Sequence, residues 1–382
     1  MKTERRYDID WLRVIAIWLL LIYHIAIIFQ PWAMFVGFIR SDELMQELWT
    51  YMSLINVWRI PLLFCVSGMG VYFAIQKRDW RPLVLERSQR ILFPFIVGFL
   101  AITPIHMLIF QYYYGMPVYY FPHAGHLWFL GNIFCYVLLL SPVFFYLKRH
   151  EDRFKAALSS FLGNPFGLMV VILFFVMEAL ILKPQIYELY AETWHGFYLG
   201  LLAFFFGFLF VYTGNAFWHT VLKWRWTFLG LAAALYTIRL FMFALSAPGY
   251  LAAVESNMWL FAIFGFAFRY LNRPSSALSY LSQAAYPVYI IHMFVLYAGA
   301  SVILPLDMPV MLKLISIVLF TLVGCYLIYE FAIRRVNVLR PVFGLKLNQN
   351  RGAKANRYAG ASLKSLPSVL KARYRTQRES RK

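Results

Sequence analysis

Charged residues are scarce in this sequence of 382 residues: they make up 14% of it, whereas apolar residues make up 62%. A soluble domain is about one-quarter charged and about half apolar. The composition therefore excludes a soluble globular protein, and it equally excludes a disordered chain. So large an apolar surface can be buried only in a membrane.

Cysteine is also scarce. Cys65, Cys135 and Cys325 stand apart in apolar runs, and no CxxC pair occurs. This spacing argues against a disulfide framework and against a zinc knuckle, and we expect no metal site. The HExxH, GxSxG, P-loop and GxGxxG signatures are missing too, so none of these motifs defines the chemistry.

Long apolar runs recur along the whole chain, each with the roughly 18–25 residues that cross a bilayer as a helix. The runs are continuous, whereas strands of a membrane barrel alternate apolar and polar residues. We therefore predict an all-α polytopic membrane helix bundle of ten transmembrane helices. The predicted spans are 11–31, 52–76, 91–111, 127–147, 166–183, 196–213, 226–246, 254–271, 284–304 and 310–333.

The distribution of lysine and arginine predicts the orientation. If the N-terminus is cytoplasmic, 31 of the 36 Lys and Arg residues fall on the cytoplasmic side. Cytoplasmic loops carry such an excess, so we predict that both termini are inside. No cleavable signal peptide is evident, because the first apolar run is too long for one. The five outer residues are Arg40, Arg59, Lys183, Arg239 and Lys313.

The formal charge of +19 belongs mainly to the C-terminal end. Residues 334–382 hold 14 Lys and Arg residues and one acid, Glu379. We expect 346–382 to form a basic, disordered cytoplasmic tail that touches anionic lipid, and 1–345 to form the membrane domain. The positive charge therefore does not indicate nucleic-acid binding.

Ionisable side chains inside a bilayer are costly and mark candidate functional sites. Arg13 and His24 in the first span are eleven residues apart, almost three helical turns, so both point to one side, about 16 Å apart along the axis. Taken singly, Arg13 is interpreted equally well as a cytoplasmic anchor, and His24 as a structural histidine bonded to a carbonyl. Together they form a polar stripe through the helix.

A second basic feature lies directly before the third span. Arg87 and Arg90 in the segment Glu86-Arg-Ser-Gln-Arg share a helix face, and we expect them at a helix N-terminus. Guanidinium groups bind phosphate with two hydrogen bonds, and the field of a helix N-terminus adds to this. The segment predicts a cytoplasmic phosphate site; a plain positive-inside cluster remains the alternative.

The outer halves of the spans hold more polar groups. His126 and Trp128 open the fourth span, and Arg239 and Glu255 have opposite charges near one face, so they are expected to pair. The loop before the fourth span is aromatic, which suits an interfacial belt or a sugar-stacking platform. Its aromatic residues are Tyr112, Tyr113, Tyr114, Tyr119, Tyr120 and Phe121.

Three more residues complete the candidate set: Arg59 in the outer half of the second span, His292 in the middle of the ninth, and Glu330 near the inner end of the tenth. Glu330 is expected to pair with Arg13 or with the Arg87 and Arg90 pair. For each acid, a structural ion pair and a catalytic role both stay open. The two polar layers suggest a phosphate-bearing donor inside and an acceptor outside, with histidine as general base.

Four blocks, in order along the chain, resemble the membrane-bound acyltransferase 3 family: Arg13-x10-His24, Arg87-x2-Arg90, His126-Leu-Trp-Phe-Leu and Tyr-Ile-Ile-His292. The resemblance covers about residues 7–345. Members of this family move acyl groups from cytoplasmic acyl-CoA to extracytoplasmic sugars. The resemblance implies that His24 is the catalytic histidine, that Arg13 is its motif partner, and that Arg87 and Arg90 contact the phosphates of acyl-CoA.

Segments 58–68, 254–256 and 328–330 resemble the subgroup of the family that succinylates osmoregulated periplasmic glucans. This implies an O-acyltransferase of the bacterial inner membrane, with succinyl-CoA or acetyl-CoA as donor substrate, a saccharide such as glucan as acceptor, and no permanently bound cofactor. Two other hypotheses stay open. The ten spans and buried charges also suit a transporter or flippase, although paired broken helices are missing. A non-catalytic scaffold docked through the tail is the third.

Overall fold

The computed structural model describes residues 5–347. These residues form only helices and connections, and ten of the helices are long and apolar enough to cross a membrane. The predicted all-α bundle of ten spans is therefore confirmed. The predicted basic tail, 346–382, lies outside the described residues apart from its first two positions.

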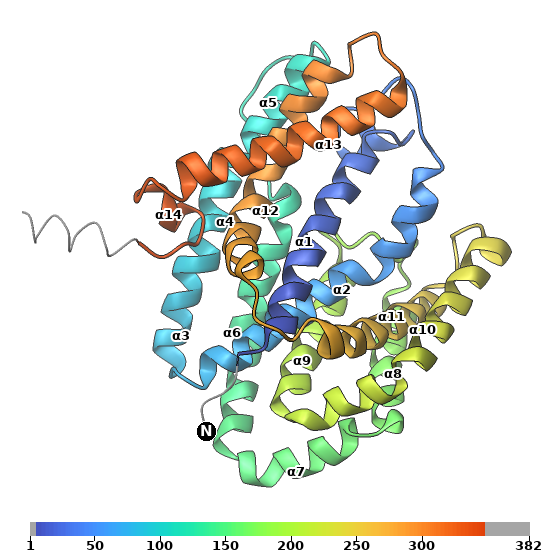
Figure 1. Ribbon diagram of the computed structural model, residues 1–382, viewed down its shortest axis with the longest axis vertical. Coiled ribbons are helices and arrows are strands. Elements are labelled where there is room, and N and C mark those ends of the chain that lie inside the picture. Colours follow the sequence, from blue (N-terminus) through green and yellow to red (C-terminus); the bar gives the residue numbers. More distant parts are fainter. Residues whose placement is uncertain (1–4, 348–382) are drawn as a thin grey trace, which may run out of the picture.

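Most spans are single helices, and the third and tenth are composite (Figure 1). Short helices α7 (Glu151–Leu162) and α14 (Leu339–Val342) lie outside the spans. The spans in chain order are α1 (Tyr7–Ile27), α2 (Leu48–Ile75), α3 (Trp80–Arg87) through α4 (Phe93–Val97) to α5 (Thr103–Tyr113), α6 (Trp128–Arg149), α8 (Pro165–Leu182), α9 (Trp194–Tyr212), α10 (Asn215–Phe243), α11 (Gly249–Tyr270), α12 (Ser276–Ile303), and α13 (Val310–Leu327) with a π-helical extension to Ile333.

Three spans begin well before the predicted first residue: the third at Trp80, α10 at Asn215 and α12 at Ser276. The extra turns carry charged or polar side chains, so their mean hydropathy is low, although they continue the same helix. The α12 turn is also capped, because the Ser275 hydroxyl accepts a hydrogen bond from the Leu278 amide. Apolar length therefore predicted the apolar part of each helix and missed its polar extension.

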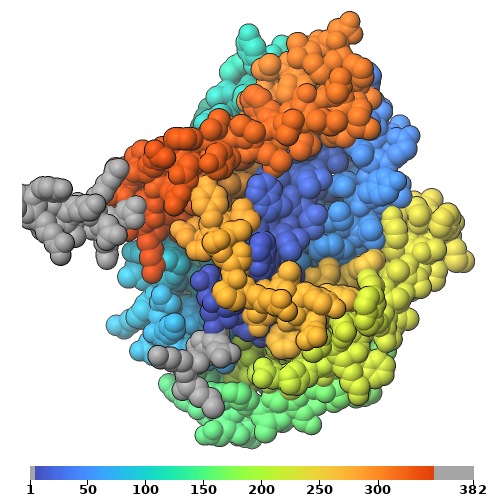
Figure 2. All heavy atoms as spheres, in the orientation of Figure 1, coloured from blue at the N-terminus to red at the C-terminus, as the bar shows by residue number. Residues whose placement is uncertain are grey.

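Helix α1 lies between α2 and α12 in the middle of the bundle (Figure 1). One side of it reaches the surface, where its dark blue atoms show in Figure 2. Two apolar residues of α1, Ile15 and Ile22, are 37% and 42% exposed. At 100° per residue, these two positions lie about opposite Arg13 and His24. The polar stripe of α1 therefore faces the bundle, and its apolar side faces lipid.

Glycines bring α2 and α9 into backbone contact. A Cβ added at Gly68 would lie 1.9 Å from the Phe204 carbonyl oxygen, and one added at Gly207 would lie 2.1 Å from the Cys65 carbonyl oxygen. Only residues without a side chain allow this approach. Gly68 thus serves close helix packing, and the contact fixes the position of α2 beside the site described below.

Candidate active site

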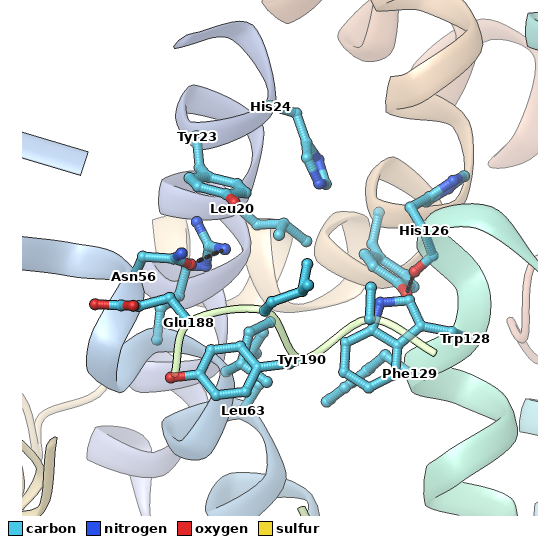
Figure 3. Close-up of a pocket in the computed structure, with 15 residues that line it drawn as sticks. Leu20, Tyr23, His24, Asn56, Leu63, His126, Trp128, Phe129, Glu188 and Tyr190 are labelled. Atoms are coloured by element: carbon cyan, nitrogen blue, oxygen red, sulfur yellow. Dashed lines mark hydrogen bonds between the residues drawn. The ribbon is translucent and has the colours of Figure 1, made fainter. Parts of the chain in front are cut away.

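A pocket lies where α1, α2 and α12 meet the beginning of α6 and the loop 183–193 (Figure 3). Its empty volume is about 540 Å³, including its open mouth. In the predicted orientation, that loop and the beginning of α6 are extracytoplasmic, so the pocket lies in the outer half of the bundle. The lining residues are Leu20, Tyr23, His24, Asn56, Arg59, Ile60, Leu63, His126, Trp128, Phe129, Glu188, Leu189, Tyr190, Ala191 and Tyr289.

His24 is hydrogen-bonded to His292, with 2.8 Å between His24 Nδ1 and His292 Nε2. The other ring nitrogen of His292, Nδ1, lies 2.7 Å from the Tyr289 carbonyl oxygen. A carbonyl can only accept, so His292 Nδ1 carries the hydrogen, and in the neutral ring Nε2 is an acceptor. His24 Nδ1 must therefore donate to it. This network leaves a free lone pair on His24 Nε2, which is what a general base requires.

His126 and Trp128 both line the pocket, as their position at the outer start of α6 predicts. His126 Nε2 donates to the Ile290 carbonyl at 3.1 Å, and the Tyr289 hydroxyl donates to the His126 carbonyl. These bonds join the 3-10 turn that precedes α6 (Gly125–Leu127) to α12 just after Pro287, which lacks an N–H group and interrupts the helix ladder. His126 thus holds the helix that carries His292.

Arg59 lines the same pocket and is 1% exposed. Its Nη2 donates to Asn56 Oδ1 at 3.0 Å, and its guanidinium lies 4.0 Å above the Tyr23 ring. Its Nε and Nη1 atoms have no hydrogen-bond partner. Tyr23 also lies against His24, with 5.5 Å between the ring centroids. Arg59 is therefore a buried cation beside the general base, with two donors unused.

A proline in α2 anchors the outer loop over the pocket. Pro61 cannot donate to the Val57 carbonyl one turn earlier, because it has no backbone N–H. The Tyr190 hydroxyl donates to that carbonyl instead, at 3.0 Å. The loop 183–193 is thereby fixed to the helix that carries Arg59, and its Leu189 and Tyr190 become pocket walls.

The expected pair of Arg239 and Glu255 is present and buried. Arg239 Nε and Nη2 lie 2.6 and 2.9 Å from the two Glu255 oxygens, and Arg239 Nη1 lies 2.7 Å from Glu188 Oε1 in the loop. Arg239 also donates to the Ser53 carbonyl at 3.0 Å. Burial raises the pKa of Glu188, and the Arg239 guanidinium opposes that shift. Glu255 therefore supports the loop from behind and does not line the pocket.

The inner layer holds the arginines of the predicted phosphate site. Arg13 and Arg87 both approach Gly70 of α2: a Cβ there would lie 3.6 Å from Arg13 Nη2, and Arg87 Nη2 lies 3.5 Å from the Gly70 carbonyl oxygen. Arg87 and Arg90 flank the Glu86 carboxylate at 3.3 and 3.1 Å. The three cations of the two sequence motifs are thus gathered at the end of α1 and α2 that the predicted orientation makes cytoplasmic.

One prediction for this cluster was wrong. Arg87 ends α3 and Arg90 lies in the π-helical turn Ser88–Leu92, so neither is at a helix N-terminus. The helix begins at Trp80, because residues 80–90 continue the span in spite of their charge. An anion at this place is attracted by the guanidinium groups alone, without the field of a helix end.

The family model described as an acyltransferase domain, that of the acyltransferase 3 family, matches residues 6–330. The chain belongs to this family. No curated protein and no solved structure matches the chain. The protein is therefore a multi-pass membrane acyltransferase, and the transporter and scaffold hypotheses give way to an enzyme.

A second prediction for this acyltransferase was wrong. Glu330 does not pair with Arg13, Arg87 or Arg90; its carboxylate lies 2.7 Å from Arg334 Nη1 and accepts from the Tyr280 hydroxyl at 3.1 Å. Arg334 is four residues farther along the same helical segment, and such i,i+4 pairs form without help from other elements. Glu330 thus pairs with Arg334 at the end of the last span, and it lies outside the pocket.

Four polar residues around the active-site candidate were missed from the sequence: Tyr23, Asn56, Glu188 and Tyr190. Asn56 had a usable signal, since it lies three residues before Arg59 on the same helix face. Glu188 and Tyr190 are in a loop, where no periodicity indicates direction. Among residues 5–347, no group of three or more His, Cys, Asp or Glu is placed to hold a metal ion.

Proposed function

We propose that the protein is an O-acyltransferase of the bacterial inner membrane that moves an acyl group from cytoplasmic acyl-CoA to a hydroxyl of an extracytoplasmic saccharide. The proposed donor is succinyl-CoA or acetyl-CoA. A periplasmic glucan is the proposed acceptor, on the resemblance of segments 58–68, 254–256 and 328–330 to glucans biosynthesis protein C.

The observation that carries this proposal is the free lone pair of His24 Nε2 beside a pocket in the outer half of the bundle. In the proposed reaction, His24 takes the proton of the acceptor hydroxyl while its oxygen forms a bond to the thioester carbon. The bond from that carbon to sulfur then breaks, and the CoA thiolate receives the proton. One hydroxyl and one thioester thus give one ester and one free thiol, and all atoms are accounted for. The His24–His292 bond keeps the imidazole in the tautomer that this step needs.

The inner arginines support a cytoplasmic donor. CoA carries phosphate groups at the end distant from its thioester, and Arg13, Arg87 and Arg90 provide guanidinium groups for them. Arg13 lies about 16 Å from His24 along α1, and the flexible pantetheine arm links phosphates to thioester over such a span. In this proposal Arg13 contacts the donor and does not take part in proton transfer.

The outer surface supports a saccharide acceptor. Tyr119, Tyr120 and Phe121 of the loop before α6 are all exposed, and aromatic faces outside the membrane suit stacking against sugar rings. The loop leads directly to His126 at the pocket wall. An acceptor held on these rings can present a hydroxyl to the pocket from outside.

The test uses purified protein in detergent, with acetyl-CoA or succinyl-CoA and with or without periplasmic glucan, and measures free CoA thiol. We expect glucan-stimulated thiol release that falls by about 10²- to 10⁴-fold in His24→Ala, the usual contribution of a general base. His219→Ala is the matched control, since His219 is exposed at the other end of the bundle, in the first turns of α10.

Full release by a folded His24→Ala enzyme would contradict the role of His24. Release that does not respond to glucan, but does respond to another saccharide, would keep the reaction class and replace the acceptor.

A further inference from the structure

Arg59 is the buried charge in the pocket that has no counter-ion. The guanidinium stacks on Tyr23 and has one neutral hydrogen-bond partner, Asn56. The carboxylate that lines the same pocket, Glu188, is bonded to Arg239, and the described residues contain no ion pair between Glu188 and Arg59. Arg59 Nε and Nη1 remain without partners.

Such an arrangement is costly unless a ligand completes it. A buried cation loses its hydration, and only a paired anion with hydrogen bonds offsets that loss. Residues that serve folding alone normally find their partner within the chain, as Arg239 does with Glu255. The empty donors of Arg59 therefore point to an anionic group that enters the pocket with a substrate.

We propose that Arg59 binds the free carboxylate of the acyl group, and that the donor is therefore a monothioester of a dicarboxylic acid, of which succinyl-CoA is an example. This inference rests on the proposed function, since it assigns the part of the donor that occupies the pocket. It makes Arg59 the residue that distinguishes a carboxylated acyl group from acetyl.

The layout of the pocket agrees with the shape of such a donor. Asn56, which holds Arg59, and His126 lie at opposite sides of the pocket in Figure 3, with His24 projecting between them. The thioester carbon must lie at His24, where the acceptor oxygen attacks. In a succinyl group the carboxylate is three carbon–carbon bonds from that carbon, so it can extend from His24 past Tyr23 to Arg59.

A second source of negative charge is the oxyanion that forms on the thioester carbonyl during transfer. That charge develops with every donor, acetyl included, whereas the carboxylate is present only in a dicarboxylic acyl group. The two roles therefore differ in how a loss of Arg59 affects different donors.

The experiment compares kcat/KM for succinyl-CoA and acetyl-CoA in wild type, Arg59→Gln and Arg40→Gln. Arg40 is an exposed arginine on the same side of the membrane and is the matched control. We expect the wild type to prefer succinyl-CoA, and Arg59→Gln to lower kcat/KM for succinyl-CoA by roughly 10- to 100-fold, the range for a lost charge-assisted hydrogen bond. Acetyl transfer stays within about 3-fold of wild type, because acetyl has no group for Arg59 to bind.

Ligand binding without turnover gives an independent readout. Succinate is added to detergent-purified wild type and Arg59→Gln, with its neutral diamide, succinamide, as the comparison, and Tm is measured. A ligand that binds only the folded state raises Tm, so we expect succinate to raise the Tm of wild type and not of Arg59→Gln, and succinamide, which has no carboxylate, to raise neither.

The outcomes separate this inference from the proposed function. An equal loss of succinyl and acetyl transfer in Arg59→Gln overturns the carboxylate role and supports the oxyanion role. A wild type that prefers acetyl-CoA, or a succinate shift that survives in Arg59→Gln, also overturns it. If no donor is turned over but succinate stabilises only the enzyme that has Arg59, the proposed function fails and the anion site stands.

Discussion

His24 and His292 are 268 residues apart in the sequence, and their imidazoles share a hydrogen bond of 2.8 Å. The Tyr289 carbonyl fixes the hydrogen of His292, and His292 in turn fixes the hydrogen of His24. A carbonyl and a neutral histidine thus do the orienting work that a carboxylate does in a serine hydrolase triad. No added charge is needed inside the membrane, where an unpaired carboxylate would be costly.

Replacing His292 should slow the chemical step without weakening donor binding. His292→Phe removes the acceptor for His24 Nδ1, so the wrong tautomer becomes available. We expect kcat to fall by at least about 10-fold, less than the loss in His24→Ala, with KM for acyl-CoA little changed. His292→Gln can still accept through its amide oxygen and should recover part of kcat. Steady-state kinetics measure this, and an unchanged kcat in His292→Phe would show that the bond is structural only.

Removing the inner arginines should do the opposite. Arg87→Ala combined with Arg90→Ala takes two guanidinium groups from the proposed phosphate site. KM for acyl-CoA should rise by roughly 10- to 100-fold, while kcat at saturating donor stays near the wild-type value. Arg149→Ala, an exposed arginine at the inner end of α6, is the control. If KM for acyl-CoA equals that of wild type, the phosphates of acyl-CoA bind elsewhere.

Glu255→Gln should destabilise the fold. The substitution leaves Arg239 buried with one carboxylate, Glu188, in place of two. Breaking a buried ion pair costs about 3–5 kcal/mol, and the remaining partner places the expected loss near the lower end. Thermal unfolding in detergent should show a clear fall in Tm. Glu43 is the control, because its exposed carboxylate pairs with Lys313, and Glu43→Gln should change Tm little. Equal falls in Tm for Glu255→Gln and Glu43→Gln would contradict this prediction.

The hydroxyl of Tyr190 should matter because of Pro61. Tyr190→Phe leaves the Val57 carbonyl without a donor, which costs about 1–3 kcal/mol. In a Pro61→Ala background the amide of residue 61 can donate to Val57, so the same tyrosine substitution should cost less. A double-mutant cycle of unfolding free energies measures the coupling. If the two substitutions have additive effects on the unfolding free energy, the proline is not the reason that Tyr190 binds the Val57 carbonyl.

The sequence alone was sufficient for the ten spans, because each needs about 20 consecutive apolar residues and that requirement is visible in a single chain. It also placed Arg13 and His24 on one face, since helical geometry relates residues eleven positions apart. The prediction from apolar length failed where a helix carries charged residues. Arg87 and Arg90 lie inside the third span, which apolar length predicts to begin after them.

Local spacing also explains the error at Glu330. The predicted partners were distant arginines of the same layer, while Arg334 is one turn away on the same segment. A pair at i,i+4 requires no particular arrangement of helices and is therefore the default. Arg239 and Glu255 were paired correctly because they occupy neighbouring spans at similar depth.

The sequence by itself determined that this protein is a ten-helix membrane bundle with two polar layers, because hydropathy and helix periodicity are properties of the chain as written; the lysine and arginine bias predicts which layer is cytoplasmic. Tertiary structure decided which polar groups meet. The bond of His24 to His292, the anchoring of Tyr190 on Val57 and the unpaired donors of Arg59 depend on which helices are neighbours and how they are rotated. Those choices are made by packing across the whole bundle, and packing leaves no local mark in the sequence.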